Sequence, residues 1–324
     1  VAVLLLIGGG ILLWRRRKKQ KTAAKEQAAL PVTPVDPARA QKTAQRIARI
    51  SALVSEELAV LDRNVGGKDG RYAMPWCLVL GVPGAGQSTL LANNGLHVPF
   101  RGASDEKSDA AGCRFWYYDK GVAIDVSSDV VQDEDAFRHL CSLLQSARPK
   151  RPLDCAVLVL PTTEFIGETR LTDEKLKAVG ESLYQRLQLL QQIISLIIPT
   201  YVVVSKGDML PGFTAFCAGL TPALREQMLG WSSPYEPGQP YDASWMEQAA
   251  AAIYSTQCAL QLDLLASGKL SDKERDSAFL MPRNTQSLKE PLTLLLDQLY
   301  RSSVYSESNL LRGIYLTGDA AVES

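Results

Sequence analysis

The residues best suited to chemistry lie in one glycine-rich stretch, residues 81–89, which reads GVPGAGQST. The apolar run WCLVL precedes it, and STLL at 88–91 predicts the start of a helix. Such an arrangement directs backbone N–H groups and the positive end of a helix dipole at one anionic group. Gly81, Gly86 and Ser88 match the phosphate-loop pattern G-x-x-x-x-G-K-[ST]. The stretch predicts a phosphate-binding loop, with a plain tight turn as the alternative.

The lysine position of this pattern holds Gln87. Glutamine can donate hydrogen bonds to a phosphate, but it carries no charge, and a charge-assisted hydrogen bond is about twice as strong as a neutral one. The replacement should weaken nucleotide binding, and it should weaken the stabilisation of a transition state even more. We therefore expect weak nucleotide binding or none, and no efficient hydrolysis.

Two further positions fit a nucleotide site. Asp125 lies near the end of the apolar run VAIDV, where an aspartate that helps to hold Mg²⁺ is placed in phosphate-loop proteins. A cap for the next turn is the alternative, and the following Val126-Ser127-Ser128 lacks the glycine that a phosphate-sensing loop would use. Lys206 and Asp208 belong to VSKGD, a base-reading [NTS]-K-x-D arrangement, for which a solvated turn is the alternative.

The elements that must position these residues alternate between strands and helices. Strands are predicted at 76–80, 115–118, 122–126, 155–160 and 201–205, the second and third as a hairpin, and helices at 133–147 and from 172 to about 194. Alternating strands and helices indicate an α/β domain with a mostly parallel sheet covered on both faces. We predict a P-loop NTPase domain of the small-GTPase type over residues 67–212.

The flanking segments do not continue the alternation of strands and helices. The pattern predicts a helix with one apolar stripe at 37–66 and a polar, mobile loop at 100–112. It also predicts a helical domain at 213–310, with helices at 221–229, 244–266, 272–280 and 286–302. The last strand of the sheet lies in the closing segment, 311–324.

Composition narrows the classes of function. The formal net charge of this 324-residue chain is zero, so no general field favours nucleic acid. Its six cysteines are scattered without C-x-x-C pairs, and it has two histidines, which makes a zinc site improbable. Cys77 and Cys155 lie inside apolar runs, where we expect buried free thiols, and we expect all six cysteines to be reduced in a cytosolic region.

The first residues indicate a membrane. Residues 1–14 are almost wholly apolar, and we interpret them as the end of a transmembrane helix. Residues 15–36 begin with the basic run RRRKKQK and continue as a juxtamembrane linker. The positive-inside rule places this linker, and everything that follows it, in the cytoplasm. A basic patch for nucleic acid is the alternative that we consider less favoured.

Together these landmarks resemble the cytoplasmic region of the IcmF/TssM family, the large inner-membrane component of bacterial type VI secretion machines. The resemblance covers essentially all of residues 75–318. Five motifs carry it: GVPGAGQSTLL at 81–91, the aromatic hairpin at 115–129, VSKGDMLPGFTAF at 204–216, REQMLGW at 225–231 and LRGIYLTG at 311–318.

The resemblance implies a scaffold in the bacterial inner membrane, with this region in the cytoplasm. Implied partners are a DotU/TssL-like inner-membrane protein, an outer-membrane lipoprotein reached through a periplasmic part, baseplate proteins and further copies of the chain. Implied cofactors are GTP or ATP with Mg²⁺, or none. The resemblance would assign nucleotide contacts to Gly81, Gly84, Ala85, Gly86, Gln87, Ser88, Thr89, Lys206 and Asp208, and Mg²⁺ ligation to Ser88 and Asp125. The alternative function is an active GTP- or ATP-hydrolysing switch, with Lys206, Arg101 or Lys107 compensating for the missing lysine.

Overall fold

The computed structural model describes residues 37–319, except 226, 237, 267, 269 and 303–307. Residues 43–324 form one compact unit, and the other unit, residues 1–42, is described only at its last six residues, the start of helix α2. The predicted transmembrane end and basic linker lie outside the described residues. Within the described ranges, no helix has both the length and the apolar character needed to cross a bilayer.

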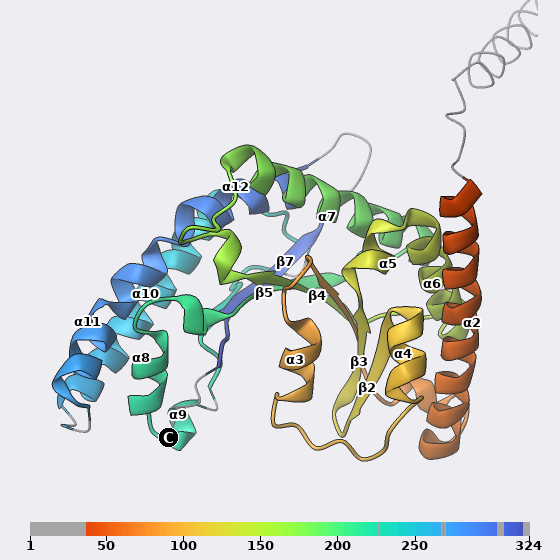
Figure 1. Cartoon of the computed structure of the whole chain (residues 1–324), viewed down its shortest axis with the longest axis horizontal. Helices are drawn as coiled ribbons and strands as arrows, with labels where there is room; N and C mark the ends of the chain where they lie inside the picture. The colour runs from red at the N-terminus through yellow and green to blue at the C-terminus, as the bar shows by residue number, and fades with distance from the viewer. Residues whose placement is uncertain are drawn as a thin grey trace, which may run out of the picture. The chain divides into compact units, whose positions relative to one another are not determined.

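A seven-stranded sheet organises the fold (Figure 1). Its strands are β1 (Trp76–Gly81), β2 (Cys113–Tyr118), β3 (Gly121–Val126), β4 (Cys155–Pro161), β5 (Pro199–Ser205), β6 (Gly230–Ser232) and β7 (Leu310–Leu316), in the order β2-β3-β1-β4-β5-β7-β6. The inner pairings, from β3 to β7, are parallel, while β2 and β6 run antiparallel at the two edges. The predicted mostly parallel sheet and the hairpin of β2 and β3 are confirmed.

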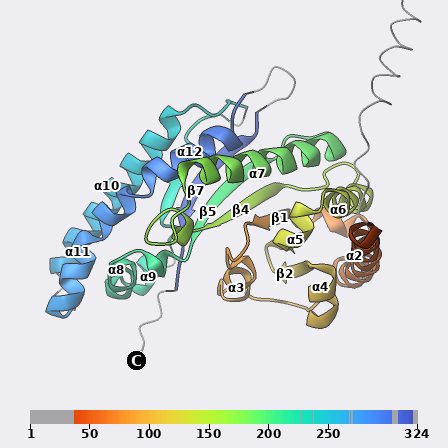
Figure 2. The same cartoon turned by 45° about the horizontal axis from the view of Figure 1, so that its top comes forward.

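Helices cover the sheet and extend beyond its β6–β7 side. They are α2 (Pro37–Val65), α3 (Gln87–Ala92), α4 (Asp105–Ala111), α5 (Ser128–Gln132), α6 (Glu134–Ala147), α7 (Asp173–Ile194), α8 (Phe213–Gly219), α9 (Pro222–Arg225), α10 (Ser244–Ala266), α11 (Asp272–Gln286) and α12 (Lys289–Leu299), with short 3₁₀ turns at Gly70–Tyr72, Thr162–Glu164 and Gly207–Met209. Helices α7 and α12 lie side by side over one face, and α3 and α4 lie on the other (Figures 1 and 2).

The two faces of the sheet are covered unequally. Successive strand side chains point to opposite faces. On β1 and β4, Leu78, Ala156 and Leu158 are fully buried, whereas Cys77, Cys155 and the neighbouring Val157 are only partly buried. The same alternation continues on β5. One face therefore forms the sealed core, and the other keeps a half-open stripe.

The sealed face depends on a close helix contact. Gly180 lies in the middle of α7, where a Cβ atom would come within 2.4 Å of the carbonyl oxygen of Leu295 on α12. The missing side chain lets the two helix backbones approach closely. Thr172 caps the start of α7 by accepting a hydrogen bond from Lys175 N, as the sequence predicts.

Two local predictions were wrong. The segment 100–112 contains helix α4 rather than an open loop, because Ser104 caps its first turn, which carries two acidic residues, and Gly112 ends it in a left-handed conformation. The stretch 221–229 forms only the short α9, and strand β6 follows within the predicted helical region because Trp231 pairs with Ile314 of β7.

Candidate functional site

The glycine-rich loop, residues 81–88, connects the end of β1 to the start of α3. Gly84 (φ 73°) and Gly86 (φ 77°) adopt the left-handed conformation that glycine reaches without strain. The Ser205 hydroxyl donates a hydrogen bond of 2.6 Å to the carbonyl oxygen of Ala85. The loop is thereby tied to the carboxyl end of β5, and the structure places it beside the Lys206–Asp208 segment.

The side chain of Gln87 folds back over this loop. It is only 8% exposed, and its Nε2 donates a hydrogen bond of 2.8 Å to the carbonyl oxygen of Val126 at the end of β3. Its Oε1 lies over Gly81, where a Cβ atom would come within 1.8 Å. The phosphate-loop pattern uses this position to reach an anion. Here the side chain is buried and bonded to a backbone carbonyl.

Substituting Gly81 by alanine tests this packing. We expect Gly81→Ala to lower the free energy of unfolding by about 1–3 kcal/mol, because the new methyl group displaces Gln87 and leaves a buried carbonyl unpaired. In a Gln87→Ala background most of that cost should disappear, which urea unfolding of the single and double variants would measure as a coupling energy. Gly238→Ala is the matched control, since a Cβ atom there meets nothing within 4 Å. If the losses of unfolding free energy of the two single variants simply add in the double variant, Gly81 and Gln87 do not pack as described.

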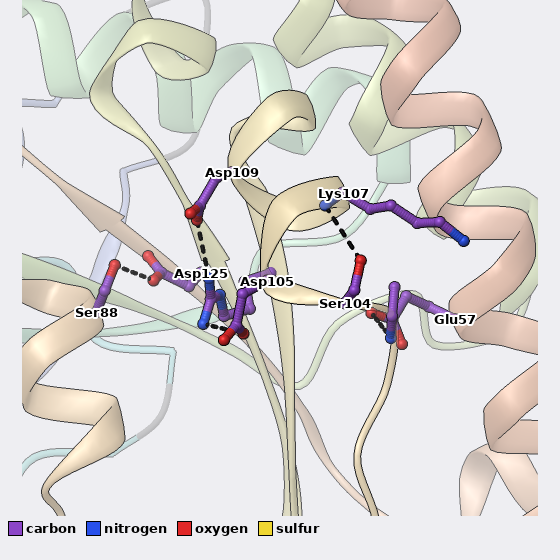
Figure 3. Close-up of polar contacts among 9 residues, drawn as sticks. Glu57, Ser88, Ser104, Asp105, Lys107, Asp109 and Asp125 are labelled. Carbon is purple, nitrogen blue, oxygen red and sulfur yellow. Dashed lines mark hydrogen bonds and ion pairs between the residues drawn. The ribbon is translucent and has the colours of Figure 1, made fainter.

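Ser88 and Asp125 meet beside the loop (Figure 3). The Ser88 hydroxyl donates a hydrogen bond of 2.6 Å to Asp125 Oδ2. Asp125 is 4% exposed, and burial raises the pKa of its carboxyl, while the hydrogen bond from Ser88 opposes the rise. The other carboxylate oxygen, Oδ1, is buried and makes no hydrogen bond within the described structure.

Hydroxyl and carboxylate oxygens are ligands that Mg²⁺ accepts, so Ser88 and Asp125 fit the metal of a nucleotide complex. Gln87 does not fit the phosphates of that complex, because it brings no charge and one of its two N–H donors holds the side chain to Val126. The site thus has groups suited to a divalent cation and lacks the one that would neutralise a polyphosphate.

Positive charge near Asp125 comes from a residue that sequence reasoning missed. Arg114 on β2 lies directly across from Asp125 in the β2–β3 pairing. Its guanidinium binds Asp105 and Asp109 of α4, each at 2.8 Å (Figure 3). The Lys107 ammonium pairs with Glu56 of α2 and points away from Ser88 and Asp125. Strand periodicity could place Arg114 on the same face of the sheet as Asp125. The sequence alone does not show that Asp105 and Asp109 of α4 bind its guanidinium.

The two predicted base-reading residues lie in the turn after β5. Lys206 is exposed, and its backbone is left-handed (φ 54°). Burial raises the pKa of Glu164, and the charge of Lys206 opposes the rise. Asp208 Oδ1 accepts a hydrogen bond of 3.0 Å from the backbone N–H of Asp319. Gly207 N donates to the Thr317 carbonyl, so this turn is fixed against the segment that follows β7.

A buried carboxyl on α2 anchors the segment that precedes α4. Glu57 is 1% exposed, and it accepts hydrogen bonds from Ala103 N (3.0 Å) and from the Tyr117 hydroxyl (2.8 Å). Gly102 leaves the space that this carboxylate occupies, since a Cβ atom there would lie 2.1 Å from Oε2. Figure 3 shows Glu57 on the side of α4 away from Ser88. No sequence signal separates this residue from the exposed acids of α2.

The buried position of Glu57 predicts a pH dependence. Burial raises the pKa of Glu57 above its ordinary value of 4.5, and the hydrogen bond from Tyr117 opposes the rise. Between the unfolded and folded pKa values the folded chain holds more protons, so stability should fall as pH rises through that window. We expect the stability of wild type relative to Glu57→Gln to decline from pH 4.5 upward in urea unfolding. The stability of Glu56→Gln, a partly exposed neighbour, relative to Glu57→Gln should decline over the same pH range but less steeply, because the charge of Glu56 adds to the raised pKa of Glu57. A stability of wild type relative to Glu57→Gln that rises with pH would contradict the burial account.

Residues 131–323, more than half of the chain, match the family described as the IcmF-related N-terminal domain. The chain belongs to this family, IcmF/TssM. A relative, the type VI secretion system component TssM1 of Pseudomonas aeruginosa, is 27% identical over 298 residues, which cover 85% of this chain. The chain spans 26% of that relative's length. The family match begins after the glycine-rich loop and includes the Lys206–Asp208 segment.

Proposed function

We propose that this chain is the cytoplasmic region of an inner-membrane scaffold in a bacterial type VI secretion machine. In this proposal it contains a degenerate P-loop domain that supports partner binding without nucleotide turnover. Membership of the IcmF/TssM family and the name of the Pseudomonas relative support the secretion role. The scaffold assignment rests on one observation, the buried Gln87 side chain bonded to Val126 in place of a free cation.

The partners proposed for this scaffold are a DotU/TssL-like inner-membrane protein, baseplate proteins and other copies of the chain, with an outer-membrane lipoprotein contacting the periplasmic part of such proteins. The site offers these partners a rigid surface, because Ser205 holds the loop and Glu57 holds the segment before α4. A scaffold of this kind needs no change of state at the loop.

Binding of the DotU/TssL-like protein of the same bacterium tests this proposal. Its affinity for the chain should be the same without nucleotide, with GTP and Mg²⁺, and with ATP and Mg²⁺, as measured by calorimetry or surface plasmon resonance. Gln87→Ala should leave that affinity within about twofold of wild type. An affinity that changes tenfold with nucleotide would overturn the scaffold assignment.

One observation favours a second candidate, a nucleotide-hydrolysing switch. Ser88 and Asp125 form a pair suited to Mg²⁺, and Arg114 lies across from Asp125 as a cation that could serve phosphate. This candidate needs Arg114 to leave Asp105 and Asp109. It predicts that wild type binds nucleotide with Mg²⁺ and that Arg114→Ala abolishes this binding. The scaffold proposal predicts no such binding by either protein.

A further inference from the structure

Two cysteines meet on the less covered face of the sheet. Cys77 of β1 and Cys155 of β4 are direct partners in the parallel pairing of these strands. Their sulfur atoms lie 3.0 Å apart, and both side chains are partly exposed. Neighbouring strands are about 4.8 Å apart, within the Cα separation that a disulfide tolerates. Cys77 and Cys155 are 78 positions apart in the chain, so only the fold brings the two thiols together.

The backbone just before each cysteine, at the start of β1 and of β4, is held by hydrogen bonds. Trp76 N donates to Asp154 Oδ2 (2.7 Å), and Asp154 N donates to the Trp76 carbonyl (2.8 Å). Arg148 and Arg151 hold the Asp154 carboxylate in turn, at 3.0 and 2.8 Å. These contacts fix both backbones one residue before the cysteines, so the strand pairing itself holds the two sulfur atoms 3.0 Å apart.

The two thiols are not equivalent. In the structure the Cys155 thiol donates to Cys77 Sγ. Once Cys155 is a thiolate it can accept from Cys77, which lowers the pKa of Cys155, whereas the contact with Cys155 raises the pKa of Cys77. The surroundings contribute Asp154, which disfavours both thiolates, and Tyr201, whose own pKa is raised by burial and by these cysteines. The lowered pKa favours Cys155 as the thiol that attacks an oxidant.

We propose that Cys77 and Cys155 are a thiol–disulfide modification site, which forms an internal disulfide on reaction with a small disulfide such as oxidised glutathione. The Cys155 thiolate attacks one sulfur of glutathione disulfide, which forms a mixed disulfide and releases one glutathione thiolate. Cys77 then loses its proton and attacks Cys155 Sγ, which forms the internal bond and releases the second glutathione. Two protein thiols are oxidised, and one glutathione disulfide is reduced to two thiols.

The rest of the described structure sets this pair apart. Cys113, Cys141 and Cys217 are buried, and burial raises the pKa of each thiol, to about 12 for Cys141 and about 11 for Cys217. Cys258 is partly exposed and belongs to a different element, α10. Within the described residues, no cluster of three or more metal-binding side chains exists. The pair is a dithiol in this structure, as a reducing compartment requires, and oxidation adds a transient state.

The test exposes the full 324-residue chain to glutathione buffers of increasing oxidised fraction, then denatures it and labels free thiols with a maleimide that adds visible mass. Wild type should lose two labels together and yield a linked peptide pair containing residues 77 and 155. Its thermal midpoint should also rise, because the bond closes a long loop of the unfolded chain. Cys258→Ser should show the same loss of two labels.

Cys77→Ser should instead stop at a glutathione adduct on Cys155, and Cys155→Ser should resist oxidation, with native circular dichroism in both. Wild type that keeps all its thiols in buffers that oxidise exposed model dithiols would overturn the proposal. An adduct on Cys155 without ring closure in wild type would overturn it as well.

Discussion

Replacing Asp154 with alanine is expected to lower the free energy of unfolding by about 3–5 kcal/mol, the cost of leaving a buried charge without its partner. Arg148 is fully buried, and its guanidinium lies over the rings of Trp76 (4.8 Å) and Tyr72 (5.1 Å). Asp154 is its ion-pair partner at 3.0 Å, and the Nε and one terminal nitrogen of Arg148 make no hydrogen bond within the described structure.

Urea unfolding followed by circular dichroism measures this loss. Glu181→Ala is the matched control, because it breaks an exposed ion pair with Arg301 and should cost less than about 1 kcal/mol. Adding Arg148→Met to Asp154→Ala should restore part of the stability, since the double variant no longer buries a lone charge. A cost for Asp154→Ala as small as that of Glu181→Ala would show that Arg148 reaches water when its partner is removed.

Replacing Gln87 with lysine is the change with the largest expected effect on binding. A hydrogen bond to a charged group contributes about 1.5–3 kcal/mol, so Gln87→Lys should tighten binding of GTP or ATP with Mg²⁺ by roughly tenfold to a hundredfold. The ligand-free variant should be less stable than wild type, because the bond to Val126 is lost. Nucleotide should restore that stability by mass action.

Fluorescent nucleotide titration and thermal unfolding with and without nucleotide measure these two effects. Gln87→Met is the control, because it also loses the bond to Val126 but brings no charge. It should lose stability and gain no affinity. If Gln87→Lys folds and still gains nothing over Gln87→Met, the missing charge is not what keeps nucleotide out.

The parts of the fold that could be predicted from sequence have strong local periodicity. The run from Trp76 to Leu80 is short, apolar and followed by glycines, and it forms β1 and the loop as expected. Helix α10 begins and ends where its pattern predicts, at Ser244 and Ala266. Helix α11 continues past Pro282 to Gln286, because Pro282 and the neighbouring Met281 are buried in its packing, and packing outweighs the proline signal there.

The rest depends on contacts between distant residues. The pairing of Cys77 with Cys155 follows from the order of β1 and β4 in the sheet, which local patterns do not contain. The placement of Gln87 over Gly81 depends on the free carbonyl of Val126 at the end of β3. Sequence could thus identify the loop and its unusual residue, but it could not show that this residue is turned inward and bonded.

Binding of labelled GTP and ATP to the wild-type chain, in the presence of Mg²⁺, tests the central claim most directly. With Gln87 buried and bonded to Val126, we predict no saturable binding of either nucleotide at micromolar concentration and no release of phosphate. Saturable micromolar binding with turnover would contradict the scaffold account, and Arg114 would then be the first residue to examine as the compensating cation.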